Sequence, residues 1–216
     1  MNVEAAIAPL DRSTTGSQVE RALRELILDG RLRPGTHLRE TQLAQSLGVS
    51  RNTLREALRS LAEQGLVTHQ PHRGVVVTDL SAEDVADLFR LRLVLEEAGL
   101  AAIDAGGIER LGEATDAFAA ALRRGDAVEA LEHDFAFHRI LVAALGSGRL
   151  SAAHERAQGE LRLVLLQLDR EYEPPQVDEH RAIVDALRSG DARSALRTHL
   201  ARAAEHLQHL LSVRES

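Results

Sequence analysis

The sequence predicts a mainly α-helical protein in which three short helices and a β-hairpin precede a bundle of six to seven helices. Three observations support this fold class. Apolar residues recur at helical spacing over most of the chain, aromatic residues make up only 2%, and strand-like runs occur only within residues 66–78. A chain of 216 residues that is 44% hydrophobic and 27% charged is long enough for one or two packed domains.

The N-terminal part contains three expected helices. Residues 1–16 show little periodicity and are expected to form a flexible leader. Apolar residues then recur at helical spacing from residue 17 until Gly30, which ends the first helix. A second helix ends at Gly48, and a third begins directly after Ser50, its expected N-cap. Two short helices joined by a tight, glycine-containing turn are typical of a helix-turn-helix.

A β-hairpin follows the third helix. Residues 66–68 and 75–78 are rich in strand-forming residues, and the loop 70–74 between them carries turn residues. A helix-turn-helix followed by a hairpin predicts a winged-helix DNA-binding domain over residues 17–79.

Residues 80–216 contain no strand-like run and are expected to form an all-helical domain. Ser81 and Asp84 resemble a capping box at its start. Glycine or proline residues separate successive helices, and Gly106-Gly107 is one such break. The expected helices cover residues 83–104, 108–124, 126–145, 148–170, 177–189 and 191–211.

Charge is divided unevenly along the chain, whose net charge is −7. Residues 1–79 carry 10 Arg against 9 acidic residues, or +1, and residues 80–216 carry 16 against 24, or −8. No lysine occurs, so each fixed positive side chain is an arginine, which suits bidentate contacts with phosphate, carboxylate or guanine. The acidity therefore belongs to the C-terminal part and does not exclude DNA binding by the N-terminal part.

The absence of cysteine excludes disulfides, thiol catalysis and cysteine-based zinc sites. Any bound metal therefore needs histidine and carboxylate ligands. No run approaches the roughly 20 apolar residues of a membrane span, and residues 1–18 lack the pattern of a signal peptide. We expect a soluble, cytoplasmic protein with no membrane partner.

The third helix has the polar and apolar faces that DNA reading requires. Its buried stripe is expected to contain Leu54, Leu58 and Leu61, while Arg51 and Arg55 lie one turn apart on the opposite face. The start of the helix offers hydrogen-bonding side chains from Ser50, Arg51, Asn52, Thr53 and Arg55. The alternative is a charged helix face that only contacts solvent.

Four polar side chains fall on the apolar faces of the C-terminal helices, namely Asp134, His138, His180 and His199. A buried carboxylate is costly unless it is paired or bound to a metal. Three imidazoles and one carboxylate suit a divalent ion such as zinc, with nickel, manganese or iron as alternatives. His206 lies along the same edge as His199 and is a rival fourth ligand, and ordinary core histidines are the alternative to a metal site.

Arg92 also lies on an apolar helix face, where an unpaired guanidinium would be costly. It therefore needs an anion, and an ion pair with Glu96 would supply one. His154 also faces inward, where it can serve in packing or line a pocket.

Several motifs resemble those of one family. Residues 32–40 (LRPGTHLRE), 47–58 (LGVSRNTLREAL) and 65–67 (GLV) resemble the GntR family of bacterial transcription regulators. Residues 134–138 (DFAFH) and 179–183 (EHRAI) resemble the FCD effector-binding domain of its FadR subfamily. The resemblance implies a homodimer that binds a near-palindromic DNA operator and responds to a small organic acid. It also implies that Arg92 faces the effector pocket and binds the carboxylate of this acid, and His154 is a second candidate for the same pocket.

The resemblance also implies roles for individual residues. Base contacts fall on Arg51, Asn52 and Arg55, and phosphate contacts on Ser50 and Thr53. The remaining DNA-binding candidates are Arg39 and the wing residues His72, Arg73 and Gly74. The family's usual Thr-Pro-Val is Asn52-Thr53-Leu54 in this chain, which predicts an altered base preference.

The C-terminal motifs depart from the family pattern at the last metal ligand. The resemblance places a histidine at position 202, where this chain has Arg202. Helical phase favours His199, one turn earlier, because it points near the core. If no such shift occurs, Arg202 replaces a ligand and the metal site is in doubt.

These observations predict a ligand-responsive transcriptional repressor rather than an enzyme. A metal-dependent enzyme using the same Asp and His residues would leave the first eighty residues unexplained. The chain also lacks an HExxH motif, a glycine-rich phosphate loop and a serine nucleophile elbow. A regulator whose metal is purely structural is the remaining alternative.

Overall fold

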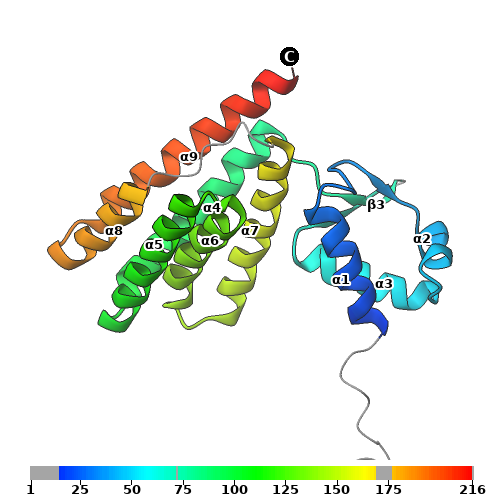
Figure 1. Cartoon of the computed structure of the whole chain (residues 1–216), viewed down its shortest axis with the longest axis horizontal. Coiled ribbons are helices and arrows are strands. Elements are labelled where there is room, and N and C mark those ends of the chain that lie inside the picture. The colour runs from blue at the N-terminus through cyan, green and yellow to red at the C-terminus, as the bar shows by residue number, and fades with distance from the viewer. Residues whose placement is uncertain (1–14, 72, 169–176, 216) are drawn as a thin grey trace, which may run out of the picture. The chain divides into compact units, whose positions relative to one another are not determined.

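The computed structural model describes residues 15–71, 73–168 and 177–215, and the chain divides into two compact units at Thr78 and Asp79 (Figure 1). The first unit contains α1 (Thr15–Leu28), β1 (His37–Leu38), α2 (Glu40–Ser46), α3 (Arg51–Glu63), β2 (Val67–Gln70) and β3 (Gly74–Val77). The second contains α4 (Ala82–Ala102), α5 (Ala105–Arg124), α6 (Ala127–Ala143), α7 (Gly148–Leu168), α8 (Val177–Ser189) and α9 (Ala192–Glu215). The mainly helical fold with an N-terminal winged helix-turn-helix is therefore confirmed.

The first unit is built around α3. Leu54, Leu58 and Leu61 on one face of this helix are almost completely buried, as are Leu23 and Ile27 of α1. The apolar spacing therefore sets which side of α3 faces the core. The cap before it forms as expected, because the Ser50 Oγ accepts a hydrogen bond from the Thr53 amide at 3.0 Å.

The small sheet has three antiparallel strands in the order β1-β3-β2, whereas the sequence predicted only the hairpin of β2 and β3. The missed strand β1 has two residues, and His37 and Leu38 pair with Val76 and Val75. A two-residue strand is too short to show the alternation on which strand prediction relies.

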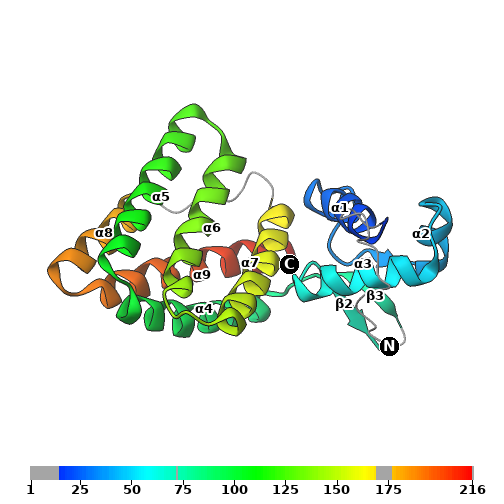
Figure 2. The same ribbon diagram turned by 90° about the horizontal axis from the view of Figure 1, so that it is seen from below.

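The second unit is an all-helical bundle. Helix α4 packs against α6, α7 and α9, while α8 packs against α5 and α9. Figure 2 shows α5 and α6 lying side by side as an antiparallel pair. A predicted capping box starts α4, since Ser81 and Asp84 each bond the other's backbone amide. Within the described residues, no helix has both the length and the apolar character needed to cross a membrane.

Several element boundaries differ from the prediction. Gly106 and Gly107 do not break the chain but lie in the first turn of α5, because Asp104 caps this helix by accepting the Gly107 amide at 2.7 Å. Helix α1 begins at Thr15, inside the expected leader, and α9 continues to Glu215 instead of stopping at residue 211. The rest of the leader (1–14), the wing residue His72 and the expected break between residues 170 and 177 lie outside the described residues, apart from the start of the next helix at Val177.

Candidate functional site

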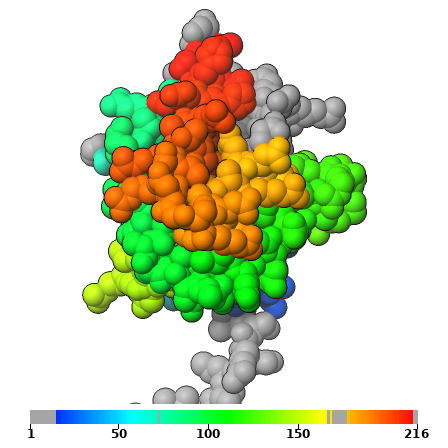
Figure 3. Space-filling model, turned by 90° about the vertical axis from the view of Figure 1, so that its left-hand side faces the viewer, coloured from blue at the N-terminus to red at the C-terminus, as the bar shows by residue number. Residues whose placement is uncertain are grey.

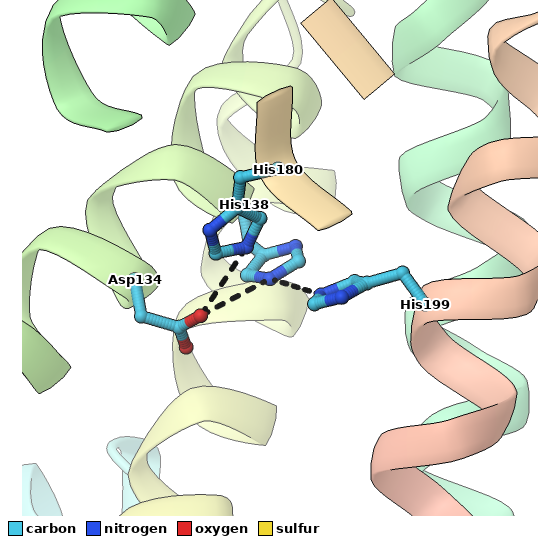
Figure 4. A group of neighbouring side chains, drawn as sticks. All are labelled: Asp134, His138, His180 and His199. Carbon is cyan, nitrogen blue, oxygen red and sulfur yellow. Dashed lines mark hydrogen bonds and ion pairs between the residues drawn. The ribbon is translucent and has the colours of Figure 1, made fainter. Parts of the chain in front are cut away.

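Four buried side chains from three helices meet inside the second unit (Figure 4). Asp134 and His138 lie one turn apart on α6, His180 lies on α8, and His199 lies on α9. One nitrogen or oxygen of each residue lies within 4.8 Å of the others. The structure therefore brings together the four residues that helical phase had selected, in a cluster that could hold a metal ion.

The distances in this cluster suit a small divalent ion. The Nε2 atoms of His138 and His199 are 3.3 Å apart, and the His180 Nε2 is 3.3 Å from the Asp134 Oδ1. Ligand atoms around a tetrahedral ion with bonds of roughly 2.0–2.1 Å are separated by about 3.3 Å. Two of the contacts therefore already have the spacing of neighbouring ligands.

Several polar atoms of the cluster have no hydrogen-bond partner among the described residues. They are the Asp134 Oδ1 and both ring nitrogens of His180, all of them buried. The approach of Asp134 to His180 is an ion-pair distance that lacks hydrogen-bond geometry. Leaving buried polar atoms without partners costs free energy, and a bound cation would satisfy the Asp134 oxygen and one His180 nitrogen.

Two glutamates hold the outer nitrogens of two histidines. The His138 Nδ1 lies 2.7 Å from the Glu96 Oε2, and the His199 Nδ1 lies 2.9 Å from the Glu179 Oε2. An Nδ1–H that donates to a carboxylate leaves the Nε2 lone pair free. Both Nε2 atoms therefore point at the centre of the cluster, where their lone pairs are free to bind a metal ion. This arrangement is usual for metal-binding histidines.

Burial keeps the inner histidines neutral. It lowers the pKa of His138 and places the pKa of His180 well below its usual value, and for His180 the neighbouring His199 and His138 lower it further. Burial alone would raise the pKa of Glu96, but Arg92 and the hydrogen bonds from His138 and His154 hold it well below its usual value. Neutral imidazoles beside ionised carboxylates are the protonation states that metal binding requires.

Glu96 also contacts Arg92. The ion pair between these two residues, which the sequence offered as an alternative to effector binding by Arg92, is therefore present. The Arg92 Nε lies 2.9 Å from the Glu96 Oε1, and the His154 Nε2 lies 3.1 Å from the same oxygen. However, the Arg92 Nη2 is buried and has no hydrogen-bond partner among the described residues. Glu96 thus uses the Arg92 Nε, whereas the Nη2 is left for another acceptor.

The rival ligands take other positions. His206 is exposed and is not part of the cluster, and Arg202 is exposed and forms an ion pair with Glu179. Sequence reasoning missed Glu179 as a partner of His199, although it lies beside His180 in the motif 179–183. The acidic residue directly before His180 in that motif was the available signal.

The DNA-binding candidates lie on the surface of the first unit. Arg39, Arg51 and Arg55 line one cleft together with His37 and Gly74, so the first turn of α3 lies near the loop end of the hairpin. The Arg55 Nε donates to the Glu40 Oε2 at 2.6 Å, which fixes this side chain against α2.

The other candidates at this surface form local contacts. Asn52 donates to Glu56 at 3.1 Å, Ser50 and Thr53 bond one another in the cap, and Arg73 donates to Gln70 at 3.3 Å. Within the described part of the chain, Arg51 is exposed and has no ion pair, so its guanidinium is available.

A helix-turn-helix with a wing, joined to an all-helical unit, defines the class of DNA-binding transcriptional regulators. The family models agree: residues 15–77 match "Bacterial regulatory proteins, gntR family" and residues 87–209 match the FCD domain. The chain belongs to the GntR family of bacterial transcriptional regulators and carries an FCD domain.

Known relatives cover nearly the whole chain. An HTH-type transcriptional regulator of Streptomyces ambofaciens is 36% identical over 90% of this chain and 85% of its own length. A relative from Paenarthrobacter nicotinovorans, named "Probable D-xylose utilization operon transcriptional repressor", is 31% identical over 92% of this chain and 91% of its own length. A GntR crystal structure from Rhodococcus sp. RHA1 has a TM-score of 0.75 and 33% identity, covering 90% of this chain and 98% of that chain.

Proposed function

We propose that this regulator is a repressor that binds a near-palindromic operator as a homodimer and senses a small carboxylate at a zinc-containing pocket of its FCD domain. The observation that carries the DNA-binding part is the division of α3, where exposed Arg51 and Arg55 stand opposite fully buried Leu54 and Leu58. Relatives named as repressors of the D-xylose and gluconate operons support the direction of regulation.

Arg51, Asn52 and Arg55 would contact base edges, and each good bidentate contact discriminates against a wrong base by about 1–3 kcal/mol. Ser50, Thr53 and Arg39 would contact phosphates or the groove edge, while His72, Arg73 and Gly74 belong to the wing. One reading helix covers one half-site, so two copies of the chain are needed for a palindrome.

Zinc suits the ligand set best because His138, His180 and His199 supply nitrogen and Asp134 supplies oxygen. Nickel, manganese and iron remain chemically compatible. A bound ion with an open position supplies a site for a ligand oxygen. Arg92 would bind the effector carboxylate through its unpartnered Nη2, and His154 would line the same pocket beside Glu96.

The DNA-binding proposal is tested by selecting DNA from a random pool with the full chain and then measuring binding of variants to the selected duplex. Arg51→Ala and Arg55→Ala each remove one bidentate donor, so we expect affinity to fall about 5–150-fold, equivalent to about 1–3 kcal/mol. The selected site should be near-palindromic and should bind two chains.

Arg24→Ala is the matched control. Arg24 pairs with Glu20, which also accepts a hydrogen bond from Gln64 just beyond the C-terminal end of α3. It therefore lies far from the first turn of that helix and should bind the duplex as the native chain does. Native affinity in both recognition-helix variants would overturn the assignment of α3.

A further inference from the structure

Three hydrogen-bonded side chains connect the surface of the domain to the cluster of Asp134 and the three histidines. The Arg202 Nη1 donates to the Glu179 Oε1 at 2.8 Å, and the Glu179 Oε2 accepts from the His199 Nδ1 at 2.9 Å. The side-chain exposure falls from 68% at Arg202 to 19% at Glu179 and 2% at His199. The Nε2 of the same His199 ring lies 3.3 Å from His138 inside the cluster.

These three side chains lie at a surface cleft between α8 and α9, the two helices that lie side by side in Figure 3. The cleft is lined by Asp178, Glu179, Ala182, Ser194, Ala195, Thr198, His199 and Arg202. Of the four clustered ligands, His199 is the one that lines it. His199 therefore separates the metal cluster from solvent on this face of the domain.

We propose that the Glu179–Arg202 pair is a positioning device that holds His199 in its metal-binding orientation and so controls how tightly, and for how long, the domain retains its metal. This inference rests on the proposed zinc site. An imidazole buried between two helices can turn about its side-chain torsions, and only one orientation directs Nε2 to the cluster. Glu179 fixes that orientation through Nδ1, and Arg202 fixes Glu179, which could otherwise turn towards solvent.

The charges support this arrangement. Glu179 lies between the Arg202 guanidinium and the His199 ring and is hydrogen-bonded to both. A carboxylate paired with an arginine is a strong acceptor for the His199 Nδ1–H. Arg202 stands where the family resemblance places a metal ligand, and in this chain it contributes to the site indirectly, through a carboxylate.

An ordinary ion pair between two helices is the competing explanation, and the chain offers a matched control for it. Arg197, also on α9, forms two hydrogen bonds to Glu97 of α4 and is 58% exposed. This second pair joins α9 to a neighbouring helix as Arg202 does, but neither of its members contacts a clustered ligand. Arg197→Ala should therefore alter helix docking without altering zinc binding.

The test compares the zinc-loaded full chain with Arg202→Ala, Glu179→Ala and Arg197→Ala. Zinc affinity is measured by competition with a chromophoric chelator, and zinc loss by the rate of transfer to excess chelator. Removing a hydrogen-bond partner of a metal-binding histidine typically weakens metal affinity about 10–100-fold. We expect Glu179→Ala to reach this range, Arg202→Ala to show a smaller loss with faster transfer, and Arg197→Ala to match the native chain.

Two further measurements separate positioning from general loss of structure. Arg202→Lys keeps a cation opposite Glu179 and should restore much of the native affinity. The visible absorption of the cobalt-substituted protein reports ligand geometry and should change in Arg202→Ala but not in Arg197→Ala. Circular dichroism identifies a variant that fails to fold, in which case Glu179→Gln and Arg202→Lys provide the comparison.

The outcomes distinguish this inference from the function on which it rests. A native chain that binds no zinc would overturn both the zinc site and the role of the pair. A native chain that binds zinc tightly, with Arg202→Ala indistinguishable from Arg197→Ala in affinity, transfer rate and cobalt spectrum, would overturn the role of the pair alone.

Discussion

At the scale of single residues, Glu96 connects the two chemical features of the helical domain. Its side chain is completely buried and contacts Arg92, His138 and His154. An isolated carboxylate in that position would be protonated, and the three partners are what keep it charged. The residue that orients a candidate metal ligand is therefore also the residue that holds the candidate effector-binding arginine.

The neutral state of His180 predicts a pH dependence of stability in the metal-free chain. Burial, then His199 and His138, hold the folded-state pKa of His180 well below 6.5. The unfolded chain takes up a proton at this position near pH 6.5, so the free energy of unfolding falls as the pH drops below about 6.5. One such proton contributes a slope of at most about 1.4 kcal/mol per pH unit.

Urea unfolding of chelator-treated protein between pH 7.5 and 5.5 measures this slope. His180→Gln removes the titrating group and should reduce the slope, although His138 leaves part of it because burial lowers its pKa as well. His209→Gln removes an exposed histidine of the same domain and serves as the control. An unchanged slope in His180→Gln would show that His180 is not the group responsible.

The convergence of the four clustered residues could be predicted from sequence because each lies within a regular helix, where phase relates position to direction. Asp134 and His138 share a face with Phe135 and Leu141, so their burial follows from local periodicity. The contact between Glu96 and His138 joins residues 42 positions apart and depends on how α4 packs on α6. Local periodicity contains no information on that packing.

At the scale of elements, the approach of α4 to α6 determines whether Glu96 reaches His138. The two helices approach each other closely at Gly99, where an added Cβ would lie 2.1 Å from the backbone oxygen of Leu141. A contact this short is with backbone, which cannot move aside as a flexible side chain can. The absence of a side chain at position 99 therefore permits the packing that assembles the site.

Gly99→Ala should therefore destabilise the domain. Overpacking in a tightly packed core typically costs about 1–3 kcal/mol, and separating α4 from α6 should also weaken zinc binding. Gly148→Ala is the matched control, because nothing lies within 4 Å of an added Cβ at the start of α7. Chemical denaturation of both variants measures the difference, and a Gly99→Ala chain as stable as the control would refute the packing argument.

The sequence was less informative about where elements begin and how they pair. Gly106 and Gly107 are tolerated inside α5 because the Asp104 cap satisfies an amide of its first turn, so residue type alone gave the wrong boundary. The two-residue strand β1 exists because β3 offers it hydrogen-bonding partners, a tertiary effect. Caps with side-chain partners three residues away, at Ser50 and Ser81, were predictable because both partners are local.

At the scale of the whole molecule, regulation requires that events in the helical domain change the affinity of the winged helix for DNA. The winged-helix domain has a net charge close to zero, so its non-specific electrostatic attraction to DNA is weak. DNA binding therefore depends on specific contacts. A ligand shifts such an equilibrium only if it binds the DNA-competent and DNA-incompetent states with different affinities. A coupling of about 1–3 kcal/mol would change operator affinity 5–150-fold.

We therefore expect one member of a panel of hydroxycarboxylates to change the affinity of the zinc-loaded chain for its selected duplex within that range, as measured by fluorescence anisotropy. Arg92→Lys keeps the charge opposite Glu96 but lacks the Nη2 donor, so it should bind DNA normally and lose the response.

Arg162→Lys is the control, since Arg162 lies 4.9 Å from the centre of the Phe135 ring, just as Arg92 lies 4.9 Å from that of Phe89. An equal response to the effector in both lysine variants would show that Arg92 does not bind the effector carboxylate. Recovery of the acid unchanged after incubation is expected of a sensor, because binding energy alone drives the switch. A zinc-dependent gain in stability without any response to the panel would instead assign the metal a structural role.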